Sequence, residues 1–281
     1  MSAARLASLL SCRIISGMMK LTVSLGQMDV KLGDVPANLA TVEALTVEAI
    51  RRGSDLVVFP ELWSTGYDLP YAANHAKPTG SGIFSTVASL AREQGIAIVG
   101  SMLSLLGDKQ YGNTAVFFDR LGRNQGEYSK VHLFRLMDED QYLTPGQRLA
   151  LVDTFWGKIG LAICYDLRFP ELFRTYALAG ANATILPAEW PNPRLSHWRT
   201  LLRARAIENQ MFVIACNRVG KTGDTSFFGR SCIVDPWGEI IVEAGEQEIL
   251  LTAKIDLNLV QSVRSKIPIF TDRRPDLYNF S

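Results

Sequence analysis

Three chemically reactive side chains stand at the ends of apolar, strand-like runs. Glu61 belongs to the segment 55–62, Lys130 to the segment 127–134, and Cys164 to the segment 159–171. An acid, an ammonium and a thiol gathered in an apolar pocket would supply a base, an oxyanion stabiliser and a nucleophile. Together these three groups can break an amide bond.

Each of these residues also has an ordinary structural interpretation. A buried cysteine is usually a small hydrophobic side chain, and Cys216 and Cys232 lie in apolar runs that favour this interpretation. Cys164 differs because the sequence turns polar directly after it and Pro170 then opens a helix, which places the sulfur at the end of a sheet. Glu61 and Lys130 taken singly could be solvated surface charges, but both lie beside residues that should be buried, where a charge needs a partner.

The energetics explain why the three groups should act together. Moving a proton from an ordinary cysteine to an ordinary glutamate is uphill by roughly 6 kcal/mol. Burial disfavours the charged carboxylate of Glu61, and a nearby ammonium favours a thiolate at Cys164. Both effects lower the free-energy cost of moving the proton from cysteine to glutamate. Lys130 and the backbone N–H of Tyr165 could then stabilise the oxyanion, while Glu61 returns its proton to departing ammonia and activates water.

Other catalytic or ligand-binding patterns find little support in this sequence. It has three histidines, with no H-E-x-x-H motif and no C-x-x-C pair, so we expect no metal site. Residues 220–222 resemble the end of a phosphate loop, but Ala215 stands where its first glycine is required. No G-x-G-x-x-G motif opens a helix and no G-x-S-x-G elbow is present, so we expect neither a nucleotide cofactor nor a serine nucleophile.

The composition is that of an ordinary globular protein. The 281 residues are 47% hydrophobic and 20% charged, with a formal net charge of +1, so we expect no nucleic-acid partner. No apolar stretch reaches the roughly 20 residues that span a bilayer. The four cysteines form no C-x-x-C pair, which favours reduced thiols and a cytoplasmic location.

Residues 1–19 are treated as an extension outside the fold. They contain two arginines, several serines and no acidic residue, a composition typical of an organellar targeting peptide. Met18 and Met19 directly precede the first strand pattern, so a start codon assigned too early is the favoured interpretation.

The rest of the chain alternates strand and helix patterns and predicts one layered α/β domain over residues 20–281. A hairpin over residues 111–133 makes part of the sheet antiparallel, and the apolar strands require helices on their faces. The predicted strands are 20–27, 55–59, 96–103, 111–119, 125–133, the run ending at 164, 183–186, 211–216, 231–235, 239–242 and 249–255. The predicted helices are 36–51, 84–94, 170–179 and 196–210.

The sequence resembles the nitrilase, or carbon-nitrogen hydrolase, superfamily. The resemblance rests on F-P-E-L at 59–62, Y-S-K-V-H-L-F at 128–134 and C-Y-D-L-R-F-P-E at 164–171, and extends from residue 20 to residue 278. It implies a four-layer αββα sandwich and a Glu61, Lys130, Cys164 triad without a cofactor. It also implies that Glu139, between Asp138 and Asp140, is a second glutamate that positions substrate and lysine.

Two further blocks, at 61–69 and 188–198, are similar to those of omega-amidases. This resemblance implies hydrolysis of a small omega-amide such as 2-oxoglutaramate through a thioester. A carboxylate in a closed pocket needs a cation, for which we nominate Arg194, with Tyr67 and Trp190 shaping the pocket. Arg194 could instead brace its own loop, and Arg168 is interpreted as structural, held by Glu171 or Asp166.

The resemblance also implies a homodimer joined through the helices that follow Cys164 and Ser196, with residues 267–278 packed against the partner. Two alternatives remain open. One is another small aliphatic amidase or an N-carbamoyl (ureido) acid hydrolase, which would differ in residues 190–198. The other is a catalytically idle binding or signalling subunit, which the intact reactive groups disfavour.

Overall fold

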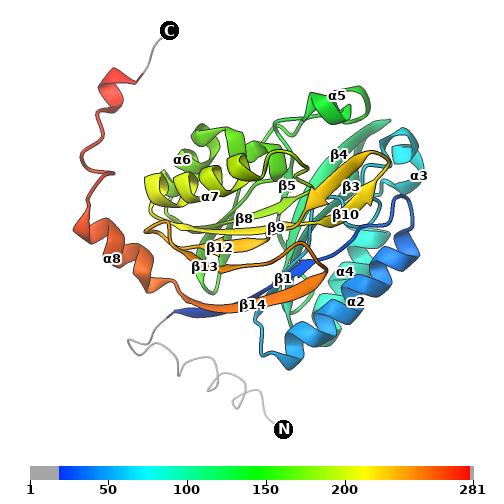
Figure 1. Cartoon of the computed structure of the whole chain (residues 1–281), viewed down its shortest axis with the longest axis horizontal. Coiled ribbons are helices and arrows are strands. Elements are labelled where there is room, and N and C mark those ends of the chain that lie inside the picture. Colours follow the sequence, from blue (N-terminus) through cyan, green and yellow to red (C-terminus); the bar gives the residue numbers. More distant parts are fainter. Residues whose placement is uncertain (1–18, 279–281) are drawn as a thin grey trace.

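Two six-stranded mixed sheets form the centre of the protein (Figure 1). The structure is a computed structural model that describes residues 19–278, so the interpretation of residues 1–19 as an extension lies outside the described part except at Met19. Met19 joins the fold, because its carbonyl accepts from the N–H of Leu257 at 2.9 Å. The first sheet has the order β14 (Ile249–Asp256), β1 (Lys20–Gln27), β2 (Leu56–Val58), β3 (Ala97–Gly107), β4 (Gln110–Phe118) and β5 (Asn124–Ser129). The second has the order β13 (Ile240–Glu243), β12 (Cys232–Val234), β9 (Phe212–Asn217), β8 (Ala181–Ala188), β7 (Gly157–Leu161) and β6 (Ala150–Thr154).

Both sheets combine a parallel centre with antiparallel edges. In the first sheet β1, β2 and β3 are parallel, whereas β4, β5 and β14 pair antiparallel. In the second sheet β7, β8 and β9 are parallel, whereas β6, β12 and β13 pair antiparallel. The parallel strands are apolar on both faces, as strands covered on two sides must be.

The apolar side chains define four layers. One core joins the facing sheets, with Val23 and Val58 from the first sheet packed in the same cluster as Ile159 and Ile185 from the second. A separate core packs α2 (Val35–Arg51) and α4 (Ile83–Gln94) on the outer face of the first sheet. Helices α6 (Pro170–Leu178) and α7 (Leu195–Asn209) cover the outer face of the second sheet (Figure 1). The expected αββα sandwich is therefore confirmed.

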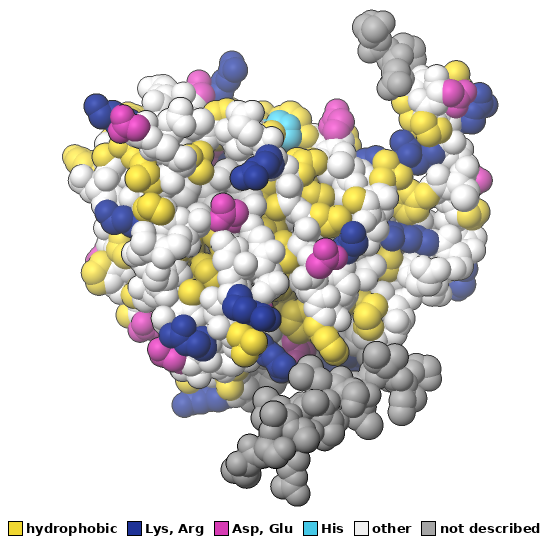
Figure 2. Space-filling view, turned by 180° about the vertical axis from the view of Figure 1, so that it is seen from behind, with side chains coloured by type: hydrophobic (Ala, Val, Ile, Leu, Met, Phe, Trp, Pro, Cys, Tyr) yellow, Lys and Arg dark blue, Asp and Glu magenta, His cyan; other side chains and the backbone are white. Residues whose placement is uncertain are grey.

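Several smaller elements complete the chain. A two-stranded hairpin joins β10 (Val219–Thr222) to β11 (Thr225–Phe228). Short helices lie at α3 (Ala72–His75) and α5 (Glu139–Tyr142), and α8 (Asn258–Lys266) follows β14. None of the helices within residues 19–278 is long and apolar enough to cross a membrane. On the face in Figure 2, basic and acidic side chains are both spread among apolar ones.

The predicted strand ends differ from the observed ones at two reactive residues. The strand expected over 125–133 ends at Ser129, so Lys130 lies just beyond β5. The strand expected to reach Cys164 is a hairpin of β6 and β7 that ends at Leu161. In both cases the strand ends before the reactive residue. The side chain is therefore not bound to the alternating directions that side chains take along a strand.

Candidate active site

Glu61 lies just beyond the end of β2, and its carboxylate is fully enclosed. Its Oε1 accepts hydrogen bonds from Asn113 Nδ2 at 2.7 Å and from Lys130 Nζ at 2.8 Å. Its Oε2 accepts one from the backbone N–H of Glu189 at 2.9 Å. Three donors from three separate segments therefore hold this carboxylate in one orientation.

Lys130 bridges two buried carboxylates. Its Nζ lies 2.8 Å from Oε1 of Glu61 and 2.7 Å from Oε1 of Glu139, and all three side chains are shielded from solvent. The backbone fixes the lysine as well, because its N–H donates to the carbonyl of Asn113 and its carbonyl accepts from the N–H of Gly146. The structure thus brings together three of the residues that the sequence singled out.

Glu139 begins α5 and is held by three donors. Its Oε1 accepts from Lys130 and from the hydroxyl of Tyr67 at 2.8 Å, and its Oε2 accepts from the backbone N–H of Phe134. Burial raises the pKa of Glu139, with Lys130 opposing this and Glu61 adding to it. Burial alone would lower the pKa of Lys130, but Glu139 and Glu61 together raise it above its usual range, so the ammonium stays charged.

Cys164 opens the short 3₁₀ helix η3 (Cys164–Arg168) that follows β7, and only 4% of its surface is exposed. Its φ of +44° lies in the left-handed region, which a residue with a side chain adopts at a cost and which often marks a functional site. Burial raises the pKa of the thiol well above its usual range, and Glu61 raises it further, whereas Lys130 lowers it. Lys130 therefore favours the thiolate, as expected, but burial and Glu61 outweigh it and favour the protonated thiol.

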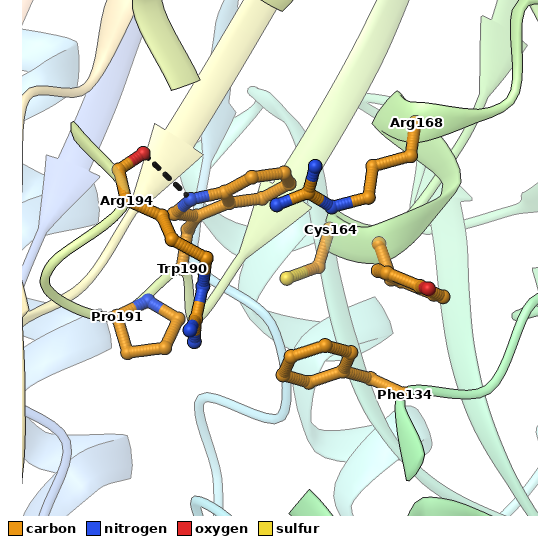
Figure 3. Close-up of a pocket in the computed structure, with 7 residues that line it drawn as sticks. Phe134, Cys164, Arg168, Trp190, Pro191 and Arg194 are labelled. Atoms are coloured by element: carbon orange, nitrogen blue, oxygen red, sulfur yellow. Dashed lines mark hydrogen bonds between the residues drawn. The ribbon is translucent and has the colours of Figure 1, made fainter. Parts of the chain in front are cut away.

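A narrow pocket that is partly open to solvent is lined by Cys164. The sulfur faces the space between Phe134, Trp190 and the guanidinium of Arg194 (Figure 3). The Arg194 guanidinium lies 5.6 Å from the centre of the Phe134 ring, and the carbonyl of Arg194 accepts from Trp190 Nε1 at 3.2 Å. Trp190 and Arg194 thus both line the pocket that contains Cys164.

Two other nominated residues lie beside the pocket in different ways. Tyr165 follows Cys164 in η3 and contributes to the wall of the pocket. Tyr67 is not part of that wall, because its hydroxyl is directed to Glu139. Burial and the charges of Glu139 and Glu61 raise the pKa of Tyr67 well above its usual range, so the phenol remains a hydrogen-bond donor.

The comparisons with known proteins agree with this geometry. The sequence model of the family described as "Carbon-nitrogen hydrolase" matches residues 22–265. This chain belongs to the carbon-nitrogen hydrolase family. The resemblance found in the three sequence blocks is thereby confirmed.

Relatives cover nearly the whole chain. A 2-oxoglutaramate amidase of Bacillus subtilis is 42% identical over 260 residues, which are 92% of this chain and 100% of the relative. An omega-amidase of Xenopus laevis is 32% identical over 251 residues, 86% of this chain and 91% of the relative. The crystal structure of Nit3 of Saccharomyces cerevisiae, a member of the nitrilase superfamily, superimposes with a TM-score of 0.84 at 30% identity, covering 92% of this chain and 97% of that one.

The structure corrects the interpretation of Arg168 in this carbon-nitrogen hydrolase. Its guanidinium lines the pocket, 4.9 Å from the centre of a Trp190 ring, and its Nη2 lies 3.2 Å from His197 Nδ1. Asp166, which we expected to hold it, has other partners. The two acids nearest in sequence were a misleading guide, because the turn of η3 sends the Arg168 side chain toward the pocket (Figure 3).

Asp166 instead connects the turn that contains Cys164 to the residues on either side of Lys130. Its Oδ2 accepts from the Tyr128 hydroxyl and from the backbone N–H of Ile163, both at 2.8 Å. Its Oδ1 accepts from the backbone N–H of His132 and pairs with His132 Nδ1 at 2.7 Å. The imidazole of His132 stacks on Phe169 with ring centres 3.6 Å apart. These contacts fix Cys164 relative to Lys130 across more than thirty residues of sequence.

Sequence reasoning also missed Asn113 and Glu189. Asn113 comes from the middle of β4, and Glu189 directly follows β8. The signal available for Glu189 was its position, since an acid between Ala188 and Trp190 interrupts an apolar run. Within residues 19–278 there is no group of three or more His, Cys, Asp or Glu side chains placed to hold a metal ion.

Proposed function

We propose that this protein hydrolyses the terminal amide of small omega-amides such as 2-oxoglutaramate, releasing ammonia through a thioester at Cys164. The observation that carries the proposal is the Lys130 ammonium held between Glu61 and Glu139. All three charges act on the thiol of Cys164, which lines the pocket. The names of the relatives from Bacillus subtilis and Xenopus laevis support the choice of amide.

The first half of the reaction forms the thioester. The Cys164 thiol gives its proton to Glu61 as the sulfur attacks the amide carbon, so no free thiolate has to exist beforehand. Lys130 and the backbone N–H of Tyr165 stabilise the oxyanion of the tetrahedral intermediate. Glu61 then donates its proton to the amide nitrogen, the C–N bond breaks and ammonia leaves.

The second half restores the enzyme. Glu61 takes a proton from water as the water oxygen attacks the thioester carbon. The C–S bond breaks, Glu61 returns the proton to the sulfur, and the carboxylic acid product releases its own proton to solvent to become a carboxylate. Glu139 holds Lys130 in place, with its Oε1 2.7 Å from the Lys130 Nζ.

The rim of the pocket supports a substrate with a carboxylate. Arg168 and Arg194 both line the pocket, and the rings of Trp190 and Phe134 keep their guanidinium groups close to the walls. A carboxylate at the far end of a short omega-amide could accept charge-assisted hydrogen bonds from either arginine. Another small aliphatic amidase or an N-carbamoyl acid hydrolase would use the same triad, but its substrate would make different contacts with Arg168 and Arg194.

Ammonia release from 2-oxoglutaramate, glutamine, an N-carbamoyl amino acid and butyramide, measured side by side, tests the proposal. We expect the highest kcat/KM with 2-oxoglutaramate and no activity in C164A at any substrate. Equal rates with butyramide would favour the simple aliphatic amidase. Activity retained by C164A would overturn the thioester mechanism.

The assembly and location are also proposed. We place the protein in the cytoplasm, in keeping with the three buried, unpaired cysteines Cys164, Cys216 and Cys232. We propose a homodimer through α6 and α7, whose exposed Leu178 and Ile207 support an apolar contact, with residues 267–278 packed against the partner. Sedimentation of the wild-type protein and of a double variant, L178E with I207E, measures the mass, and a wild-type monomer would contradict the dimer.

A further inference from the structure

Glu189 is a further buried ionisable residue beside Glu61, and its side chain has no part in the reaction described above. Its backbone N–H holds Oε2 of Glu61, and its own Oε2 accepts from Arg218 Nη1 at 3.1 Å. The side chain is fully buried, and its Oε1 has no hydrogen-bond partner among residues 19–278. A buried carboxyl oxygen without a donor calls for an explanation, because such an oxygen is costly when the group is ionised.

Arg218 is a fixed and shared cation. Its side chain is fully buried, with Nη2 donating to the carbonyl of Val30 at 2.7 Å and to Asp29 Oδ1 at 3.2 Å. The guanidinium lies 4.3 Å from the centre of the Phe227 ring. Arg218 therefore cannot turn to give a second hydrogen bond to Glu189, and Asp29 claims part of its charge.

The buried groups do not balance if all are ionised. Three carboxyl groups, on Glu61, Glu139 and Glu189, face two cations, Lys130 and Arg218, and every one of these side chains is inaccessible to solvent. Glu61 and Glu139 each accept three hydrogen bonds across both oxygens. Glu189 accepts one, and it is the carboxyl group with an oxygen free to carry a proton.

The charges around Glu189 agree with this assignment. Burial raises the pKa of Glu189 to about 7, with Arg218 lowering it, Glu61 raising it and Lys130 lowering it. The Tyr67 phenol also feels the charge of Glu189. Arg218 and Lys130 thus favour the ionised carboxylate of Glu189, whereas burial and Glu61 favour the protonated acid.

We propose that Glu189 is a positioning residue that holds Glu61 through its backbone and, by carrying a proton at rest, keeps the buried carboxyl cluster close to neutral while negative charge develops on the substrate. The part of this inference that concerns the reaction rate rests on the proposed amidase function. Ionised Glu189 adds a negative charge near the forming thiolate and oxyanion, and in a low-dielectric site such a charge opposes both. The rate should therefore fall as Glu189 loses its proton.

The variant E189Q tests this because glutamine has nearly the same shape, keeps an oxygen for Arg218 and cannot ionise. For the wild type we expect kcat/KM for 2-oxoglutaramate to decline about tenfold per pH unit above a midpoint near neutral pH. For E189Q we expect that decline to move at least one pH unit higher, with activity below the midpoint within about threefold of the wild type. The exposed E246Q provides a charge-matched control with an unchanged profile.

Alkylation of Cys164 by iodoacetamide, followed by mass spectrometry, gives a second readout that needs no substrate. The midpoint of its pH dependence should be lower in E189Q than in the wild type, because the thiolate then forms without a neighbouring anion. Identical midpoints and identical kcat/KM profiles would overturn the proposal. If the wild type hydrolyses no amide, the proposed function fails, and the alkylation midpoints still decide the role of Glu189.

If E189Q does not fold, the wild type alone decides by infrared spectroscopy. A carbonyl band of a protonated carboxyl group should disappear as the pH is raised through neutrality. The absence of such a band at acidic-to-neutral pH would show that the cluster carries no resting proton and would overturn the proposal.

Discussion

The Nζ of Lys130 lies 2.8 Å from Oε1 of Glu61, and neither side chain is accessible to solvent. A buried ion pair contributes little net stability, but each partner depends on the other. Glu139 extends the pair to a group of two carboxylates around one ammonium. The free energy of unfolding should therefore respond to the loss of the cation far more than to the loss of one carboxylate.

We expect K130M to lose amidase activity and to lower the free energy of unfolding by about 3 to 5 kcal/mol, because two buried carboxylates then lack a cation. Urea unfolding measures the change. In K130M with E139Q, part of the stability should return without any return of activity. K158M, at a half-exposed lysine, is the control and should stay within about 0.5 kcal/mol of the wild type. A K130M protein as stable as the wild type would contradict the ion-pair account.

We expect R168A and R194A each to lower kcat/KM for 2-oxoglutaramate by about 10- to 100-fold, the worth of a charge-assisted hydrogen bond. The effect on butyramide, which has no carboxylate, should be within about threefold. R135A serves as control because Arg135 is exposed and lies outside this pocket. An arginine whose removal slows both substrates equally braces the loop and does not bind the carboxylate.

We expect D166N to lower kcat by about 100-fold with little change in KM, since a displacement of about 1 Å between catalytic groups has that effect. Asparagine has one accepting oxygen in place of two, so it can keep the Ile163 and Tyr128 contacts or the His132 contacts, but not both. Y128F removes only one of the Asp166 contacts and should cost less than tenfold. Steady-state kinetics with 2-oxoglutaramate measures both variants. A normal kcat in D166N would show that the Asp166 contacts are not needed to position Cys164.

The raised pKa of Glu189 also predicts how stability depends on pH. Its value of about 7 in the folded protein exceeds the ordinary value of 4.5, so folding takes up a proton. The stabilising contribution is complete below about pH 4.5 and is lost as the pH rises through 7, an amount of about 3 kcal/mol. The melting temperature of E189Q relative to the wild type should therefore rise between pH 5 and pH 8. A constant difference across this range would contradict the prediction.

Part of the site could be predicted because Glu61 and Cys164 follow the apolar strands β2 and β7. Lys130 follows the polar strand β5, which β3 and β4 separate from β2, so its place beside Glu61 was implied by the resemblance to the family. The partners of Asp166 could not be predicted, since they are set by contacts over more than thirty residues. The same reason explains the error at Arg168. Its guanidinium contacts Trp190 and His197, which are more than twenty residues away in sequence, and not the acids close to it in sequence.

Some of the fold was also hidden from pattern reasoning. The turn between β6 and β7 contains Phe155, which is 82% exposed, so an apolar residue concealed a hairpin. The hairpin of β10 and β11 contains few apolar residues and looked like a loop. Helix α8 was missed because only Val260 and Val263 of its residues are buried, which gives a weak helical pattern.

The wall formed by Trp190, Pro191 and Arg194 belongs to one short connection between β8 and α7, whereas Glu61, Lys130 and Cys164 follow other strands. Much of the pocket wall is thus encoded apart from the groups that cleave the bond, whereas Tyr165 and Arg168 share η3 with Cys164. Redesigning this connection together with Arg168 should retarget the enzyme to new amides while Glu61, Lys130 and Cys164 stay in place.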